Sequence, residues 1–261
     1  GLGTKVVRSM STGDEFAYYV INLDRSKNRW QRINGHLQNL GIEAQRVSAV
    51  YGADLPEEEI ARYYIPYLNQ KQFFMPLKPA EIGCFISHIK ALKTFIDQNN
   101  KAYAVILEDD IEFIGDVQDY RHQWLDAVQQ PEPVMLKIYS RRKVNGERVN
   151  SQHYFNTIRP RLIPLGTQAV LYNRAAAIKL LDTYGQFSMP VDVAYQHFWQ
   201  HGVRVLVSES NHVKEISAQL GGSNISNKRD LALTYKIKRE LKRSWYRFKL
   251  WLLSLYYFSN P

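Results

Sequence analysis

Apolar runs of strand length alternate with segments of helical periodicity along most of the chain. Residues 16–23 form the first such run and predict a buried strand. In the segment that follows, Asp24 is placed to cap a helix and Gly41 to end it. Apolar side chains recur on one face of this helix, at Trp30, Ile33, Leu37 and Leu40. Residues 43–50 predict a second strand, so the chain opens with a β-α-β unit of the doubly wound type, although it lacks the glycine fingerprint of dinucleotide-binding proteins.

Similar patterns continue through the rest of the chain. Asp54 and Pro56 precede three acids and predict a helix start. Residues 79–98 have a broad apolar face that is typical of a helix packed on a sheet. Asn145-Gly146 is a strong signal for the turn of a hairpin. The other predicted elements are a helix at 119–130, a strand at 134–138, a strand at 166–172 followed by a helix capped by Asn173, and a helix start at Met189-Pro190-Val191-Asp192.

One strand ends in three consecutive acids. Residues 103–107 are apolar and fit a buried parallel strand, which runs directly into Glu108, Asp109 and Asp110. In open α/β sheets ligands bind beyond the carboxyl ends of the strands, and acids there can hold a metal that carries phosphates. The same acids could instead form a solvated turn. A basic chain, with 34 Lys and Arg against 25 Asp and Glu, favours a site in which a cation holds the acids together.

Composition limits the class of protein. At 261 residues with 45% hydrophobic content, the chain is long enough for a folded α/β domain with a substantial core. Its formal charge of +9 favours polyanionic partners, which include nucleic acid, an anionic membrane surface and phosphorylated substrates. A single cysteine, Cys84, excludes an internal disulfide and fits a reducing compartment. His197 and His201 have metal-ligand spacing, but Phe198 stands where a metalloprotease helix has Glu, so no zinc site is predicted there.

The last segment, residues 230–261, differs from the rest in composition. Seven Lys and Arg lie within residues 236–249 against a single acid, and residues 250–258 are almost wholly apolar. This apolar run is too short to cross a bilayer, whereas a basic helix with an apolar face can lie in an anionic leaflet. The alternative is a helix docked on the domain. We therefore predict a domain at 16–229 and a basic amphipathic C-terminal helix at 230–261. Residues 1–15 lack a signal-peptide core and are left out of the fold prediction.

Five motifs, in order along the chain, resemble glycosyltransferase family 25, the lipopolysaccharide and lipooligosaccharide galactosyltransferases of Gram-negative bacteria, with collagen galactosyltransferases as distant relatives. The motifs are Val20-Ile21-Asn22-Leu23-Asp24 with Arg25 and Arg29, Glu81-Ile82-Gly83-Cys84-Phe85-Ile86-Ser87-His88, Ile106-Leu107-Glu108-Asp109-Asp110, Gly166-Thr167-Gln168-Ala169, and Pro190-Val191-Asp192. Each motif alone is weak, whereas the ordered set is specific. The resemblance implies a GT-A type, Rossmann-like nucleotide-sugar-binding fold, a UDP-sugar donor and inversion at the anomeric carbon.

The resemblance also implies roles for single residues. The family's Asp-x-Asp motif is represented here by Glu108-Asp109-Asp110, whose first acid is longer by one methylene. We expect Glu108 and Asp110 to bind Mn²⁺ or Mg²⁺, because both ions prefer oxygen ligands and stabilise the charge that develops on a diphosphate leaving group. Asp192 is the expected general base for the acceptor hydroxyl. The residues expected to contact the donor are Asn22, Asp24, Arg29, Ser87, His88, Asp109 and Thr167.

The sequence therefore predicts transfer of a hexose, taken to be galactose, to a lipopolysaccharide, lipooligosaccharide or lipid-linked glycan acceptor. The expected location is the cytoplasmic face of the inner membrane of a Gram-negative bacterium, and no nucleic-acid partner is expected. Alternatives are UDP-glucose as donor, a metal-dependent phosphoesterase or nuclease, and a non-enzymatic membrane adaptor. Locally, Asp24 and Arg29 could merely cap and solvate a helix, Asp192 could be a helix cap, and His88 could be a core residue.

Overall fold

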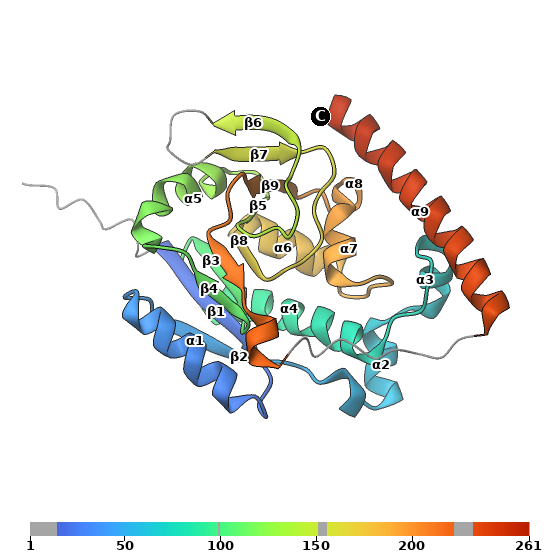
Figure 1. Cartoon of the computed structure of the whole chain (residues 1–261), viewed down its shortest axis with the longest axis horizontal. Helices are drawn as coiled ribbons and strands as arrows, with labels where there is room; N and C mark the ends of the chain where they lie inside the picture. The colour runs from blue at the N-terminus through green and yellow to red at the C-terminus, as the bar shows by residue number, and fades with distance from the viewer. Residues whose placement is uncertain (1–14, 99, 151–155, 222–231, 261) are drawn as a thin grey trace, which may run out of the picture.

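The computed structural model describes residues 15–98, 100–150, 156–221 and 232–260. Within these ranges an eight-stranded mixed sheet forms the centre of the molecule, in the order β2-β1-β3-β8-β5-β9-β7-β6 (Figure 1). A separate antiparallel pair consists of β4 and β10. The strands are β1 (Phe16–Asn22), β2 (Ala44–Ser48), β3 (Tyr103–Glu108), β4 (Ile111–Phe113), β5 (Val134–Lys137), β6 (Gly146–Asn150), β7 (Thr157–Pro160), β8 (Ala169–Asn173), β9 (Arg204–Ser208) and β10 (Val213–Glu215).

The described strands of the central sheet all run in one direction except β7 and β8. β1 pairs in parallel with β2 and β3, and β5 pairs in parallel with β9. β8 lies antiparallel between β3 and β5. The α/β class predicted from the sequence is thus confirmed, with a large, mostly parallel sheet. This topology brings the carboxyl ends of β1, β3, β5 and β9 and the amino end of β8 to one edge of the sheet.

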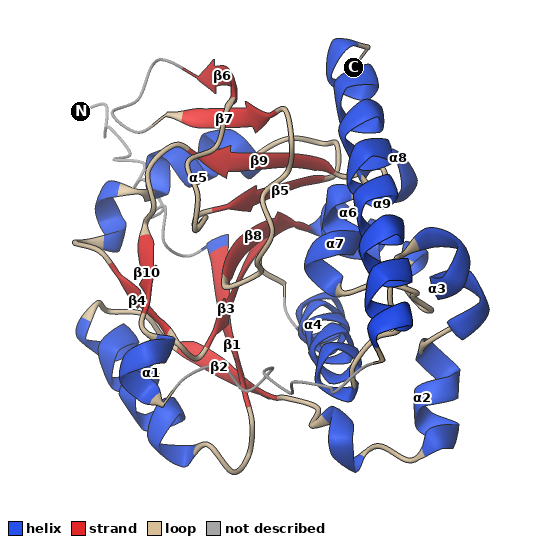
Figure 2. Ribbon diagram, turned by 45° about the vertical axis from the view of Figure 1, so that its right-hand side comes forward, coloured by secondary structure: helices blue, strands red, loops and turns tan. Residues whose placement is uncertain are grey.

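Helices cover both faces of the sheet, because successive strand residues point to opposite sides. Val20 shares a core with Ile33 of α1 and Trp124 of α5. Tyr19 points to the other face, where it packs with Phe85 of α4 in a core that α6 and α7 complete (Figures 1 and 2). The helices are α1 (Lys27–Asn39), α2 (Glu57–Tyr63), α3 (Pro66–Gln72), α4 (Pro79–Gln98), α5 (Arg121–Val128), α6 (Arg174–Thr183), α7 (Val191–Gln196), α8 (Phe198–His201) and α9 (Leu233–Ser259).

Several predicted elements are confirmed closely. The helix predicted at 79–98 is α4, and the opening β-α-β unit is β1, α1 and β2. Gly41 ends α1 with a positive φ of 73°, a conformation that costs glycine little. Asn173 caps α6, because its side chain accepts a hydrogen bond of 2.8 Å from the Ala176 amide.

Three local predictions are wrong. Asp24 does not cap α1: Ser26 occupies that position, and the Asp24 carboxylate accepts hydrogen bonds from Arg46 and Ser48 instead. Asp54 lies in a 3₁₀ turn at Gly52–Asp54, and Pro56 is the residue that precedes α2. Asn145-Gly146 does not form a hairpin turn, because Gly146 already pairs with Pro160 as the first residue of β6. The connection from β6 to β7 includes residues 151–155, outside the described ranges.

The C-terminal helix α9 packs along α3 and α8 at the outside of the molecule (Figures 1 and 2). The Tyr246 ring lies 5.3 Å from the Phe73 ring, centroid to centroid, and the Tyr246 hydroxyl lies 2.8 Å from His197 Nε2. Tyr257 stacks on Trp199 at 5.6 Å. We call this side of α9 its docked face: Tyr246, Leu250, Ser254 and Tyr257. No helix in the described part of the chain combines the length and apolarity needed to span a bilayer.

Candidate functional site

The edge of the sheet where β1, β3 and β5 end holds the polar residues that the sequence motifs contain. Asn22 and Glu108 are the last residues of β1 and β3, and the register pairs Ile21 with Glu108. Thr167 immediately precedes Gln168, whose carbonyl accepts a 2.9 Å hydrogen bond from the Glu108 amide. Strand pairing therefore brings together three motifs that lie far apart along the chain.

Asp109 is held by two residues of the first motif. Asn22 Nδ2 donates to Asp109 Oδ2 at 2.8 Å, and Arg29 Nη1 lies 3.4 Å from Asp109 Oδ1. Arg32, which the sequence motifs did not single out, donates to the Asp109 carbonyl at 2.9 Å and to the Ile111 carbonyl at 2.8 Å. These bonds fix the turn that carries the acids, so Asn22, Arg29 and Asp109 form one cluster.

Asp24 lies at the rim of the same edge. Its carboxylate accepts from Arg46 and from the Ser48 hydroxyl, the latter at 2.7 Å. Arg46 Nε also donates to Asn22 Oδ1 at 2.9 Å, which ties the rim to the Asp109 cluster. The side chain of Asp24 is 74% exposed, so its carboxylate remains accessible from solvent.

A chain of hydrogen bonds runs from Glu108 into the core. The Thr167 hydroxyl donates to Glu108 Oε2 at 3.2 Å, and it lies 3.2 Å from His88 Nε2. Because a hydroxyl has one proton to give, His88 Nε2 is left as the donor to Thr167. Burial lowers the pKa of His88 to about 4, so the ring is neutral at physiological pH and fits this arrangement.

The backbone of Asp110 is bonded to the residue that follows β10, whereas one oxygen of its side chain lacks a hydrogen-bond donor within the described part of the chain. The Asp110 carbonyl accepts from the Ile216 amide at 2.8 Å. Its side-chain atom Oδ1 is buried, and no group among the described residues donates a hydrogen bond to it. A buried carboxylate oxygen without a donor is costly, so the arrangement favours an additional positive group at this position.

The raised pKa values of two of these acids also favour an additional positive group at this position. Burial and the neighbouring Asp110 raise the pKa of Glu108 to about 8. Burial and the neighbouring Asp109 and Glu215 raise the pKa of Asp110 to about 6. Both shifts mean that burial, together with the neighbouring acids, disfavours the ionised forms at this edge, and a nearby cation would lower both pKa values.

Asp192 joins the site from the amino end of α7. Its Oδ2 accepts from the Gly166 amide at 3.1 Å, and its Oδ1 accepts from the Val193 amide at 2.9 Å. Gly166 adopts a φ of +96°, which favours glycine, so the turn that presents its amide depends on that residue. Pro190, not Asp192, is the residue that precedes α7. The fourth and fifth motifs thus meet through a direct hydrogen bond.

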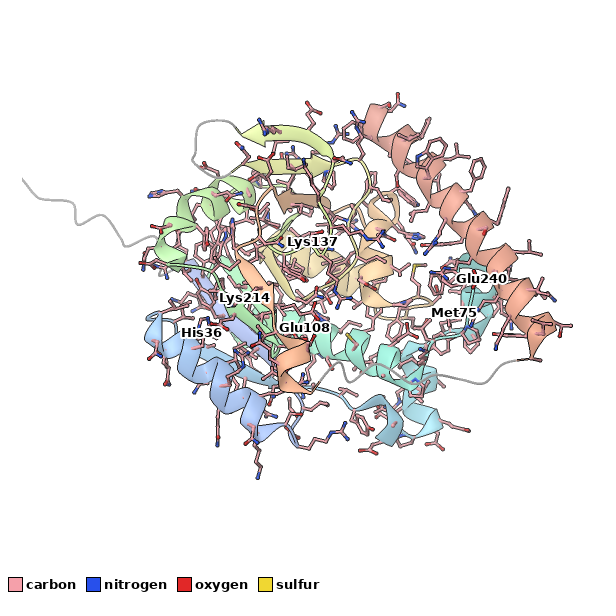
Figure 3. All side chains as sticks on the ribbon, in the orientation of Figure 1. His36, Met75, Glu108, Lys137, Lys214 and Glu240 are labelled. Atoms are coloured by element: carbon pink, nitrogen blue, oxygen red, sulfur yellow. The ribbon has the colours of Figure 1, made fainter. Side chains whose placement is uncertain are left out.

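Lys137 belongs to the site, although the sequence interpretation missed it. It is the last residue of β5, is 1% exposed, and donates through Nζ to the Pro164 carbonyl. Burial lowers the pKa of Lys137 to about 7, while Asp192 and Glu108 act to raise it. In the view of Figure 3, Glu108 and Lys137 lie near the centre of the molecule. Applying the rule about carboxyl ends of strands to β5 as well as to β3 would have found this residue.

Ser87 and Gly83 support the site from α4. The Ser87 hydroxyl donates to the Gly83 carbonyl at 2.7 Å and accepts from the Val50 amide at 2.8 Å. A Cβ on Gly83 would lie 2.5 Å from the Val50 carbonyl oxygen and 2.7 Å from the Gly52 nitrogen. Ser87 is 2% exposed, so its visible contacts position the loop after β2; its predicted contact with a donor stays a prediction.

The donor set of the site fits a hard divalent cation. Glu108 and Asp110 supply carboxylate oxygens, and Asp110 Oδ1 is the atom without a partner. Within the described ranges, no group of three or more His, Cys, Asp and Glu side chains is arranged to hold a metal. A cation here would therefore take its remaining ligands from substrate oxygens and water, as Mg²⁺ commonly does.

Fold and site together define an α/β protein with an acidic cluster at the carboxyl edge of its central sheet, which is where such proteins bind ligands. The chain matches glycosyltransferase family 25, described as an LPS biosynthesis protein, over residues 16–195. It therefore belongs to this family. The matched range includes all five motifs, from Val20 to Asp192.

Curated relatives match a smaller part of the chain. Procollagen galactosyltransferase 1-A from Xenopus laevis is 33% identical over 112 residues, which are 42% of this chain and 18% of that protein. Procollagen galactosyltransferase 2 from Homo sapiens is 30% identical over 128 residues, 48% of this chain and 20% of that protein. The matched region thus spans a fifth or less of the length of these relatives.

A solved structure shows a weaker likeness. The crystal structure of A197 from STIV has a TM-score of 0.43 and 13% sequence identity, over 77% of this chain and 83% of that chain.

Proposed function

We propose that this protein is a metal-dependent, inverting glycosyltransferase with a GT-A type fold, which moves galactose from a UDP-sugar to a lipopolysaccharide or lipooligosaccharide acceptor. The observation that carries the proposal is the acidic cluster after β3, where Asp110 Oδ1 has no partner among the described residues and two carboxyl groups have raised pKa values. Membership of glycosyltransferase family 25 and relatives named as galactosyltransferases support the choice of reaction and sugar.

Glu108 and Asp110 would hold the cation, Mn²⁺ or Mg²⁺. When bound, such an ion stabilises the negative charge that develops on a diphosphate leaving group. The residues of this chain then have separate tasks. Thr167 and His88 orient Glu108 through their hydrogen bonds, and Arg29 with Asn22 holds the turn at Asp109.

Asp192 is the proposed general base. In an inverting reaction a carboxylate takes the proton of the acceptor hydroxyl on the face opposite the leaving group. Asp192 is held by the amides of Gly166 and Val193, which donate to its two carboxylate oxygens. Lys137 interacts electrostatically with Asp192 from the end of β5. These contacts support a side chain that is fixed in orientation.

The nucleotide is proposed to bind at the rim that β1 and β2 form. Asp24 is exposed there, and Arg29 and Asn22 lie next to Asp109. We place the acceptor as a lipid-linked glycan at the cytoplasmic face of the inner membrane of a Gram-negative bacterium. UDP-glucose remains the alternative donor, since a hydroxyl epimer is distinguished by a few hydrogen bonds.

The test is a donor screen with the whole chain. UDP-galactose, UDP-glucose and UDP are added with Mn²⁺ or with EDTA, and both donor hydrolysis and the melting temperature are measured. We expect hydrolysis and a rise in melting temperature with UDP-galactose and Mn²⁺, because a ligand that binds only the folded state stabilises it. Transfer to a panel of core oligosaccharides, with the anomeric configuration read by NMR, then tests inversion. Absence of hydrolysis and of stabilisation with every UDP-sugar would overturn the proposal.

A further inference from the structure

The side of α9 that faces away from the protein is apolar. Its large apolar residues are between 37% exposed, at Leu255, and 69% exposed, at Leu241. They recur at helical spacing and lie opposite the docked face, since side chains three or four residues apart share one side of a helix. We call this set the outward face of α9: Ile237, Leu241, Trp245, Phe248, Trp251, Leu252 and Leu255.

Packing inside the protein does not account for this face. The docked face already buries Leu250 and Ser254, which are 7% and 4% exposed. Figure 3 shows Glu240, on the same helix, to one side of the molecule, whereas Glu108 and Lys137 lie near the centre of the view. An extended apolar surface of this kind marks a binding site for a partner, not a core.

Basic side chains border the outward face on both sides. Lys238, Lys242 and Lys249 fall along one border at helical spacing, Arg247 lies on the other, and all four residues are exposed. Glu240, the only acid of the helix, lies 3.5 Å from Arg239 and 3.6 Å from Arg243, measured between nitrogen and oxygen atoms. Glu240 therefore offsets the two arginines next to it, and no acid of the helix lies on the border that Lys238, Lys242 and Lys249 form.

We propose that the outward face of α9 binds an anionic lipid bilayer, with the helix lying in the plane of the membrane. An apolar stripe between basic borders matches such a surface, where apolar side chains enter the acyl region and Lys and Arg meet anionic headgroups. Trp245 and Trp251 are 67% and 51% exposed, and indole rings favour the headgroup level. A second copy of the chain fits less well, because pairing two such faces would bring the basic borders together.

The test uses the whole chain and vesicles of phosphatidylcholine, alone or mixed with phosphatidylglycerol, in a flotation assay. We expect binding to the mixed vesicles, release at high salt, and little binding to phosphatidylcholine alone. Lys242→Glu with Lys249→Glu should lower the bound fraction by roughly tenfold or more, because each basic side chain near an anionic surface contributes on the order of fivefold. The matched control is Lys93→Glu, on the exposed side of α4, which should leave binding unchanged.

Apolar contact is tested separately. Leu241→Ser with Trp245→Ser should abolish flotation without loss of fold, whereas Ile178→Ser, an exposed position on α6, should have no effect. Brominated lipids should quench the fluorescence of Trp245 and Trp251 in the bound protein. Flotation that ignores lipid charge, or that survives the Leu241 and Trp245 changes, would overturn the proposal. So would a dimer in sedimentation that these same changes dissociate, with no flotation at all.

Vesicle binding needs neither donor nor acceptor. A failed donor screen would therefore not argue against membrane binding by the outward face of α9. A failed flotation assay would not argue against the transfer reaction.

Discussion

At the scale of single residues, Glu108 is an acid that keeps its proton at neutral pH, because burial and Asp110 raise its pKa to about 8. Its folded-state pKa lies above the usual 4.5, so the folded protein binds more protons between these two values. Without a metal, ionisation of Glu108 should therefore cost stability as the pH rises through this window. Asp110, with a pKa of about 6, adds to the same trend.

Glu108→Gln removes the loss of stability that ionisation of Glu108 should cause as the pH rises. In EDTA the variant should melt at a higher temperature than the wild type at pH 9 and at nearly the same temperature at pH 5. The difference at pH 9 should be about 1 kcal/mol or more, since a tenfold change in proton binding corresponds to about 1.4 kcal/mol. Melting curves across pH measure it. A difference that does not grow with pH would show that the pKa of Glu108 is not raised in the folded protein.

Asp110→Ala should abolish transfer and make UDP binding independent of Mn²⁺. The physical reason is that a carboxylate on the cation contributes several kcal/mol of charge stabilisation, which no other group can replace at that position. Titration calorimetry with UDP, with and without Mn²⁺, measures the effect. Asp182→Asn, an exposed acid on α6, is the control and should behave as wild type. Wild-type turnover in Asp110→Ala would show that the residue does not hold the cation.

Asp192→Asn should lower kcat by roughly 100-fold or more while donor affinity stays near normal, because that is the usual contribution of a general base. An asparagine oxygen can still accept one of the bonds that the Gly166 and Val193 amides donate, so the loss of stability should be small. Kinetics and thermal melts together decide the role. A drop in stability with little kinetic loss would favour a structural role for Asp192.

At the scale of elements, α4 lies so close to the loop after β2 that a side chain at Gly83 has no room. Gly83→Ala should destabilise the fold by about 1–3 kcal/mol, the usual cost of overpacking, and should displace the Ser87 contact to Val50. Gly35→Ala, in the middle of α1 with no atom within 4 Å of the added Cβ, should instead be neutral or stabilising by up to about 1 kcal/mol. Urea unfolding measures both. If the two substitutions changed the free energy of unfolding equally, the close approach of α4 to the loop after β2 would be contradicted.

The same substitution should cost much more stability on the docked face of α9 than on its outward face. Leu250→Ala removes a buried side chain of the docked face and should cost about 2 kcal/mol or more. Leu241→Ala, on the outward face, should cost little stability, because that side chain is 69% exposed. Unfolding free energies of the two variants provide the measurement. If Leu241→Ala were the more damaging change, the assignment of the two faces would be reversed.

At the scale of the whole molecule, α9 has two surfaces with different partners. The docked face buries Leu250 and stacks Tyr246 against Phe73, so α9 helps to stabilise the domain against which it lies. Deleting the helix would remove these contacts and expose apolar surface on α3 and α8. Point substitutions on the outward face are therefore the sharper way to separate membrane binding from folding.

The sequence by itself determined most of the local elements and which residues the family motifs contain. Apolar runs of strand length and patterns of period 3.6 placed β1, α1, β2 and α4, because the side chains that a strand or helix buries follow its own geometry. The acids after β3 were visible for the same reason, since a strand end is a local feature. The ordered motifs indicated the family that the match over residues 16–195 then established.

Only the tertiary structure decided which residues meet. Strand register is non-local, so the contact of Asn22 with Asp109 and the placement of Lys137 beside Asp192 and Glu108 could not be read from spacing. Gly146 entered β6 instead of a turn because pairing with Pro160 in β7 overrode its local preference. The sequence predicted an amphipathic helix at the C-terminus. Which of its sides packs on the protein depends on the shape of α3 and α8, and this choice leaves its apolar stripe facing outward.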